Sequence, residues 1–313
     1  MEPDKELAAR RLGMLFVAGS AILFAAKGLF AKALYQRGVG FELLVTVRAL
    51  LAMPLFVWFA LHSNRGAQAT APAPLRAYVA ASLAGIIGYY AGALVDFWAL
   101  ELIDASIERV LLFSYPALVV LISSFTRRRA PERRIVMAMA VTYAGIFFAM
   151  GGIDLSELRA NLYGASLVLI AALTTAIYFL IGERYVHQLG STRFAAVGMS
   201  SSAVVLALHF ALFRSFDEVV ALDAHDWLLL AILGVACMFV PGLMQAEGVR
   251  RVGAQRAAIG STVGPPTTIV LAALFLGERL NGWQILGSTM IVASVSWLAL
   301  RGQARDDRRD GTA

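Results

Sequence analysis

Ten long apolar segments constrain the fold of this chain more than any other feature of its sequence. They are residues 12–35, 41–61, 77–100, 105–126, 135–152, 161–182, 194–213, 227–249, 255–276 and 281–300. A helix that crosses the hydrocarbon core of a bilayer needs about 20 mostly apolar residues. The pattern therefore predicts an all-α integral membrane protein with ten transmembrane helices.

The basic residues between these segments predict its orientation, because Lys and Arg are enriched in cytoplasmic loops. The connections on the side of the N-terminus hold most of them, including the dense stretch 127–134. The opposite side has only a few, namely Arg37, Arg159, Arg214 and Arg279. We therefore expect both the N-terminus and the C-terminus to be cytoplasmic.

Composition excludes several classes of protein. The chain is 15% charged and 59% hydrophobic, whereas soluble domains are about a quarter charged and about half apolar. Its net charge of +6 is explained by cytoplasmic loops that meet anionic lipid, so no nucleic-acid partner is expected. Residues 12–35 follow a basic N-terminus but exceed a signal peptide in length, which indicates a retained first helix. The short loops favour a multi-pass protein of a bacterial-type inner (plasma) membrane.

No pattern of catalytic or metal-binding residues is present. The single cysteine, Cys237, lies inside an apolar segment, which excludes a disulfide within the chain and a cysteine-based metal site. Phosphate-binding loops, zinc-binding His-Glu-x-x-His and nucleophile elbows are missing from the sequence. The basic stretch 127–134 is explained by its cytoplasmic location without a phosphate substrate. We expect no enzyme activity, no metal and no cofactor.

A weak internal repeat divides the chain into residues 1–153 and 154–313. A shift of 149 residues places Pro116 on Pro265 without a gap. Each half contains five predicted spans, an odd number, so the second half begins on the opposite side of the membrane and is inverted. Inverted five-helix repeats are typical of secondary transporters, which bind substrate near the bilayer midplane and alternate its access to the two sides. Channels built from repeats remain an alternative.

Several motifs carry a family resemblance. They are Arg48-Ala-Leu-Leu-Ala, Ala105 with Tyr115-Pro116, Gly253-Ala-Gln-Arg-Ala-Ala with Gly264-Pro265-Pro266, and Leu276-Gly-Glu-Arg-Leu with Gln284 and Gly287. Together they resemble the ten-helix EamA-type branch of the drug/metabolite transporter superfamily, and within it the aromatic amino acid exporters of the YddG type. The first half departs from this pattern, because Arg128-Arg129 stands where the family has Gly-Glu.

The resemblance implies export of small metabolites, with aromatic amino acids as the first candidates, and places spans five and ten at the periphery. An organic-phosphate antiporter of the same superfamily is the main alternative, and a channel or a membrane enzyme is a remote one. The partners implied are a small-molecule substrate and the lipid bilayer. Nothing in the sequence specifies an oligomeric state.

Three ionisable residues inside the spans are candidate substrate-binding residues. Lys27, Arg48 and Asp96 are all expected in one layer of the outer half of the membrane. Buried charges in a membrane usually face a partner or a wet cavity. Lys27 would bind a substrate carboxylate and Asp96 an ammonium group or a proton. Alternatively, these residues only neutralise one another as ion pairs, and Arg48 in particular is expected to be a structural charge.

Aromatic residues complete the candidate site. Phe24 shares a helical stripe with Lys27, and Tyr89 shares a helix face with Asp96. Tyr178 is the counterpart of Lys27 when the first spans of the two halves are aligned with a shift of 151 residues, while Tyr115 stands beside a proline. Each would contact an aromatic substrate, or would only pack against neighbouring helices.

Prolines inside the spans predict helix breaks. A proline removes one backbone hydrogen bond, and interrupted membrane helices usually line cavities. The candidate break or gating residues are Pro116, Pro241, Gly264, Pro265 and Pro266. The repeat-equivalent pair Pro116 and Pro265 is the strongest indication of a central site, although such kinks can also serve packing alone.

Overall fold

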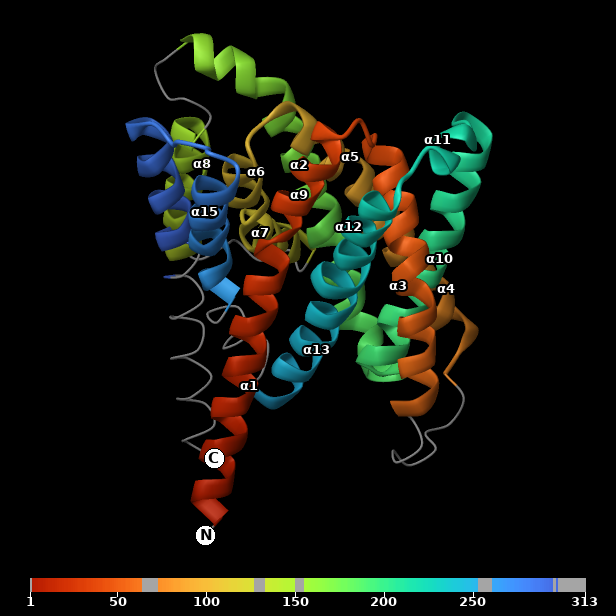
Figure 1. Ribbon diagram of the computed structural model, residues 1–313. Helices are drawn as coiled ribbons and strands as arrows, with labels where there is room; N and C mark the ends of the chain where they lie inside the picture. The colour runs from red at the N-terminus through yellow and green to blue at the C-terminus, as the bar shows by residue number, and fades with distance from the viewer. Residues whose placement is uncertain are drawn as a thin grey trace.

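The computed structural model describes residues 2–63, 73–126, 133–149, 155–252, 261–294 and 297. Throughout these ranges the regular secondary structure is helical, and the helices form one bundle (Figure 1). The N-terminus lies at one end of the bundle, and the short helix α11 lies at the other end.

The helices follow the apolar segments. The first part of the chain contains α1 (Glu2–Ala25), α2 (Lys27–Gln36), α3 (Phe41–Ser63), α4 (Leu75–Gly85), the π-helix η1 (Ile86–Ala91), α5 (Gly92–Leu102), α6 (Ala105–Leu112), α7 (Tyr115–Thr126) and α8 (Arg133–Ala149). The second part contains α9 (Leu155–Leu189), α10 (Ser191–Phe213), α11 (Asp217–Val220), α12 (Ala224–Gly234), the π-helix η2 (Val235–Phe239), α13 (Val240–Val252), the 3-10 helix η3 (Ser261–Val263), α15 (Gly264–Phe275) and a helix over residues 282–294.

The molecule is an all-α membrane protein. Among the described residues, 7 helical segments are long and apolar enough to cross a bilayer, and they match seven of the predicted spans. The predicted fifth and ninth spans correspond to the shorter apolar helices Val136–Ala149 and Gly264–Phe275. Residues 255–260 and 298–300, at the ends of the predicted ninth and tenth spans, lie outside the described residues. The count of ten spans and the cytoplasmic termini therefore stay predictions.

Small residues allow the helices of this bundle to approach closely. A β-carbon at Gly85 of α4 would collide with the backbone of Gly198 in α10, and one at Gly92 of α5 would collide with Thr174 in α9. Close backbone approach through small residues drives helix association in lipid, where apolar side chains gain little by leaving the hydrocarbon. The glycine face predicted on the third span is thus a packing face.

Interruptions of the helices recur at the interval of the predicted repeat. The π-helices η1 and η2 begin 149 residues apart. Helices α7 and α15, each preceded by a break, also begin 149 residues apart. These recurrences are consistent with two homologous halves. One interruption has no counterpart: the first span breaks at Ala26, whereas α9 runs without a break for 35 residues.

The candidate prolines lie beside these interruptions, where the sequence predicted helix breaks. Pro116 is the second residue of α7, and Pro265 and Pro266 lie in the first turn of α15. Pro241 instead follows the π-helix η2 inside the continuous helical segment Ala224–Gln245. A proline costs little in a first turn, because its missing N–H would have no partner within the helix. Pro54, which is not among the prolines predicted to mark helix breaks, also lies inside a helix, α3.

A carboxylate from the second half caps a helix of the first half. Gly277 adopts a left-handed conformation with φ of 69° directly after α15, which is a conformation that favours glycine. The following residue, Glu278, accepts hydrogen bonds from the backbone N–H groups of Ala105 and Ser106 at 2.9 and 3.1 Å, and from the Ser106 hydroxyl at 2.7 Å. Carboxylates stabilise helix N-termini through these N–H groups and the helix dipole. The Gly-Glu pair therefore fixes the start of α6.

Glu278→Gln is expected to lower the thermal unfolding midpoint of the detergent-solubilised protein, because an amide has a single acceptor oxygen for three donors. The lost charge-assisted bonds correspond to about 1–3 kcal/mol. The neighbouring Arg279 is exposed, so Arg279→Gln is a matched control that should leave the midpoint nearly unchanged. Equal shifts in the two variants would contradict a capping role for Glu278.

Candidate functional site

The candidate site begins at the break in the first span. Helix α1 ends at Ala25 and α2 begins at Lys27, so the side chain of Lys27 projects from the first turn after the break. The hydroxyl of Thr268, on α15, donates to the carbonyl of Ala25 at 3.3 Å. A neighbouring helix thus satisfies a backbone group at the break, as the interior of a membrane requires.

Lys27 is shared by two carboxylates from two other helices. Its Nζ atom lies 2.6 Å from Oδ2 of Asp96 on α5 and 3.1 Å from Oε1 of Glu108 on α6. All three residues are buried, and Glu108 is only 1% exposed. An isolated charge at this depth is costly, and hydrogen-bonded pairing offsets much of that cost. We refer to Lys27, Asp96 and Glu108 as the charged triad.

Arg48 lies beside the triad without joining it. Its guanidinium carbon lies 4.1 Å from the ring centroid of Phe97, and Nζ of Lys27 lies 5.1 Å from the same centroid. Cation–π contact partly replaces a lost hydration shell. Both cations thus contact this fully buried ring, and the two carboxylates contact Lys27. By count of charges the group of Lys27, Arg48, Asp96 and Glu108 is neutral. The ion pair between Arg48 and Asp96 that had been considered is not formed.

Unfilled hydrogen-bonding capacity is concentrated near this group. Five buried side-chain atoms in the described part of the chain lack a hydrogen-bond partner: Arg48 Nε, Asp96 Oδ1, Arg109 Nε, Ser114 Oγ and Ser202 Oγ. Three of these atoms belong to the triad or to residues next to it in space or in sequence. Buried polar atoms are rarely left unpaired, and those that are call for an explanation. Arg109 was not among the predicted site residues, although a charged residue inside a predicted span is a candidate functional residue.

An aromatic cluster adjoins the charged group. The rings of Tyr89 and Tyr178 meet edge to face at 4.9 Å, and Tyr115 stacks on Phe179 at 5.3 Å. Tyr178 also contacts Phe179 and Phe194. Tyr89 interacts electrostatically with Arg48, so the cluster and the charged group are neighbours. We refer to Tyr89, Tyr115, Tyr178, Phe179 and Phe194 as the aromatic cluster.

Helix breaks separate two pairs of residues that would share a face in a continuous helix. Phe24 is half-buried on α1, and the break at Ala26 separates it from Lys27, so the expected continuous stripe is interrupted. The turn after α6 likewise separates Glu108 from Tyr115. As a result Glu108 faces Lys27 while Tyr115 faces α9. Gln245, the repeat counterpart of Asp96, accepts a hydrogen bond from Ser20 at 2.6 Å instead of joining a charged group.

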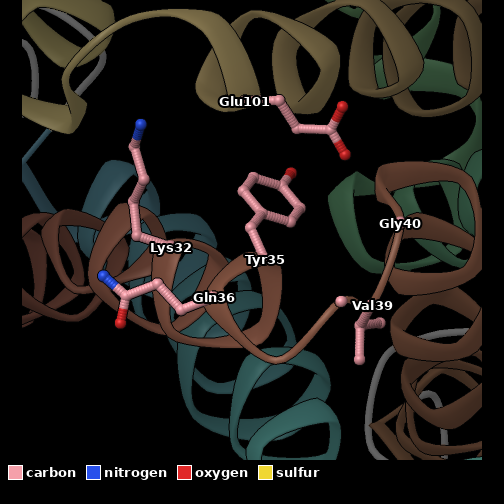
Figure 2. A pocket seen from close by; sticks show the side chains of 7 residues that line it. Lys32, Tyr35, Gln36, Val39, Gly40 and Glu101 are labelled. Carbon is pink, nitrogen blue, oxygen red and sulfur yellow. The ribbon is translucent and has the colours of Figure 1, made fainter.

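A pocket of about 560 Å³ lies further along α2, lined by Lys32, Tyr35, Gln36, Gly38, Val39, Gly40 and Glu101. Figure 2 shows Lys32 and Glu101 on either side of the Tyr35 ring. The hydroxyl of Tyr35 donates to the carbonyl of Phe97 at 2.8 Å. Because Phe97 also contacts Lys27 and Arg48, Tyr35 and Phe97 link the pocket to the charged group.

An ionic latch at the same end of the bundle joins the connection after α2 to the start of α12. Arg37 forms ion pairs with Asp226 and with Asp223. Its Nη2 atom lies 2.5 Å from Oδ2 of Asp223. The pKa of Asp223 is lowered from 3.8, first by the N–H of Asp226 and then by the charge of Arg37. A lowered pKa means that this stabilisation is present above pH about 4 and is lost as the pH falls further. The ion pair of Arg37 with Asp223 is therefore charged at neutral pH; we refer to Arg37, Asp223 and Asp226 as the Arg37 latch.

A second ionic contact lies near the latch. Arg214 binds Glu42 at 3.0 Å and Glu218 at 2.9 Å. With the latch, it ties the start of α3 and the end of α2 to helices α10, α11 and α12. No group of three or more His, Cys, Asp or Glu side chains that could hold a metal ion occurs within the described ranges.

Comparison with known proteins identifies the family. The chain matches the EamA-like transporter family twice, over residues 11–151 and 162–300. It is 30% identical over 289 residues to "Uncharacterized transporter YcbK" of Bacillus subtilis (strain 168), with 91% of this chain and 92% of that protein covered. It is 21% identical over 297 residues to "Uncharacterized inner membrane transporter YicL" of Salmonella typhimurium (strain LT2), with 94% and 97% covered.

A known crystal structure that is 18% identical in sequence shares the fold. It covers 92% of this chain and 98% of its own, with a TM-score of 0.61. The two matches to one family over successive parts of the chain agree with the recurring helix interruptions. The chain belongs to the EamA-like transporter family of the drug/metabolite transporter superfamily and is a multi-pass membrane transporter, not an enzyme.

Proposed function

We propose that this protein exports small zwitterionic metabolites, with aromatic amino acids as the first candidates, by alternating access. The proposed architecture has ten spans, cytoplasmic termini and two inverted halves, residues 1–153 and 154–313. The proposed location is a bacterial-type inner membrane, as the name of the relative YicL states for that protein. The substrate would bind between the halves, where the charged group and the aromatic cluster adjoin.

The unfilled hydrogen-bonding capacity of the charged group carries this proposal. Asp96 Oδ1 is buried and free to accept a hydrogen bond from a substrate ammonium group. Arg48, which is buried, and Arg109, which is half-buried, each have a buried Nε atom without an acceptor, and each could donate to a carboxylate. An α-amino acid presents both groups, so its binding would complete the hydrogen bonds that the empty protein lacks.

The aromatic cluster supports a ring on the substrate. Tyr89 and Tyr178 present two aromatic faces next to Arg48, and aromatic pairs in edge-to-face or offset geometry add about 0.5–1.5 kcal/mol to burial. Lys27 would take part by exchange: a substrate ammonium that binds Asp96 competes with Lys27 for the same carboxylate. Binding would then loosen the triad and the contact between α2 and α5.

Alternating access requires contacts that form in one state and break in the other. The Arg37 latch and the Arg214 contact lie at the end of the bundle that the distribution of basic residues assigns to the outside. They would close the outer side, and the pocket beside Tyr35 would be the outer vestibule. Release of substrate would require these contacts to open.

An organic-phosphate antiporter is the second candidate. A phosphate group needs at least two cationic side chains, and Arg48 and Arg109 are both free of acidic partners among the described residues. The two Lys27-bound carboxylates count against a strongly anionic substrate. Substrate competition therefore separates the two candidates better than mutation does.

Counterflow in sealed proteoliposomes tests the proposal. Vesicles loaded singly with unlabelled aromatic amino acids or organic phosphates should accumulate the labelled aromatic amino acid only when loaded with amino acids. Lys27→Met is expected to reduce this exchange about tenfold or more, because removing one partner of a buried ion pair leaves uncompensated charge. Flux without saturation or counterflow would indicate a channel instead.

A double variant separates loss of transport from loss of folding. Lys27→Met combined with Glu108→Gln removes one positive and one negative charge, so the charged group stays neutral. We expect the double variant to fold better than Lys27→Met and to remain inactive. Recovery of full exchange in the double variant would show that Lys27 only balances charge.

Arg37→Ala is expected to open the outer side more often, and Cys237 provides a native probe of that opening. It is the only cysteine of the chain and is 3% exposed, on η2 within electrostatic range of Arg48. An exposed ion pair contributes up to about 1 kcal/mol, so labelling by an impermeant thiol reagent added outside should accelerate by up to about fivefold. Arg159→Ala removes an exposed arginine elsewhere and serves as the control. Unchanged labelling in Arg37→Ala would remove the latch from the mechanism.

A further inference from the structure

Among the described residues, Arg109 lies near the triad and is a positive charge beyond those that match Asp96 and Glu108 in number. Lys27 and Arg48 match the two carboxylates Asp96 and Glu108 in number, and Lys27 binds both carboxylates directly. Arg109 follows Glu108 on α6, yet its Nε atom is buried and has no hydrogen-bond partner. The side chain as a whole is half-buried, but a buried guanidinium nitrogen without an acceptor is unfavourable, so one hydrogen bond is missing here in the empty protein.

The position of Arg109 places its charge at the start of α15. A β-carbon at Gly264 would lie 3.1 Å from Nη2 of Arg109, so the guanidinium packs against the first residue of that helix. A side chain at position 264 would require the guanidinium to shift by a few tenths of an ångström. The 12-residue helix α15 adds the positive end of its dipole at the same place. Ser114, in the turn that follows α6, is 2% exposed, and its hydroxyl also lacks a partner.

We propose that Arg109 binds an oxyanion, the carboxylate or phosphate group of the transported metabolite, at the junction of α6 and α15. This inference rests on the proposed transport function and names the group by which the substrate is recognised. Arg48 differs from Arg109 in that it lies over the Phe97 ring and within electrostatic range of Asp96. Recognition of the oxyanion would then explain why residue 264, at the start of α15, is a glycine, because a side chain there would crowd the guanidinium.

The inference makes a statement about substrate class. A metabolite that carries a carboxylate or phosphate would supply the acceptor that Arg109 lacks, and one that is only cationic would not. A zwitterion would use Arg109 for its carboxylate and Asp96 Oδ1 for its ammonium group. Neutral and cationic compounds should bind weakly or not at all.

Ligand-induced thermal stabilisation of the purified full-length protein tests this without any transport assay. The probes are L-tryptophan, indolepropionate, which lacks the ammonium group, tryptamine, which lacks the carboxylate, and glycerol phosphate. Wild-type protein should be stabilised by at least one of the three anion-bearing probes at lower concentration than by tryptamine. Arg109→Gln should raise the half-saturating concentration of that probe about tenfold or more and leave tryptamine unchanged.

Two further variants keep the result interpretable. Arg109→Lys retains the charge but not the planar fork, so it should keep the preference for anions with weaker binding, and it replaces Arg109→Gln if that variant does not fold. Arg159→Gln removes an exposed arginine and should behave as wild type. Arg109-dependent stabilisation by glycerol phosphate alone would uphold the oxyanion site and refute amino acid export. Equal binding of anions by Arg109→Gln and wild type, a preference of wild type for tryptamine, or no stabilisation by any anionic probe would overturn the proposal.

Discussion

The cost of placing charge inside a membrane governs the arrangement of this protein. Lys27, Asp96 and Glu108 come from three helices, and none of them would be tolerated at this depth alone. Their mutual contacts therefore hold α2, α5 and α6 together as firmly as apolar packing does. Because apolar side chains gain little by leaving lipid for the protein interior, polar contacts and close glycine packing must supply the specificity that a hydrophobic core supplies in water.

The geometry of the triad depends on contacts outside it. The break at Ala26 directs Lys27 towards α5 and α6, and Thr268 of the second half satisfies the carbonyl exposed there. Glu278, also from the second half, fixes the first turn of α6 and thereby the positions of Glu108 and Arg109. The charged group thus lies in the first half but is held in place by the second. Any relative movement of the halves acts directly on the site.

Most of the fold could be predicted from the sequence, because long apolar segments leave the backbone no alternative to helix in lipid. The same logic selected Lys27, Arg48 and Asp96, and applied consistently it would also have selected Arg109. The pairing of Lys27 with Glu108 could not be predicted, since it depends on a helix break that no proline or glycine marks at Ala26. The prolines predicted the places of the other breaks but not their form, because a helix can restart at a proline as easily as bend at one.

The first span is broken at Ala26, whereas its counterpart in the second half is continuous. This difference has a consequence for the resting state. In the proposed alternating-access cycle, identical inverted halves with the same break and the same charges would give inward-facing and outward-facing conformations that are related by a two-fold rotation and have equal free energies. Here α9 is a continuous helix of 35 residues, while the first span is broken at Ala26, beside Lys27. The two conformations are then different structures with different strain and solvation, so the empty carrier populates one of them in preference. A difference of only 1.4 kcal/mol would make that preference about tenfold, which sets the side from which the vacant site is most often reached.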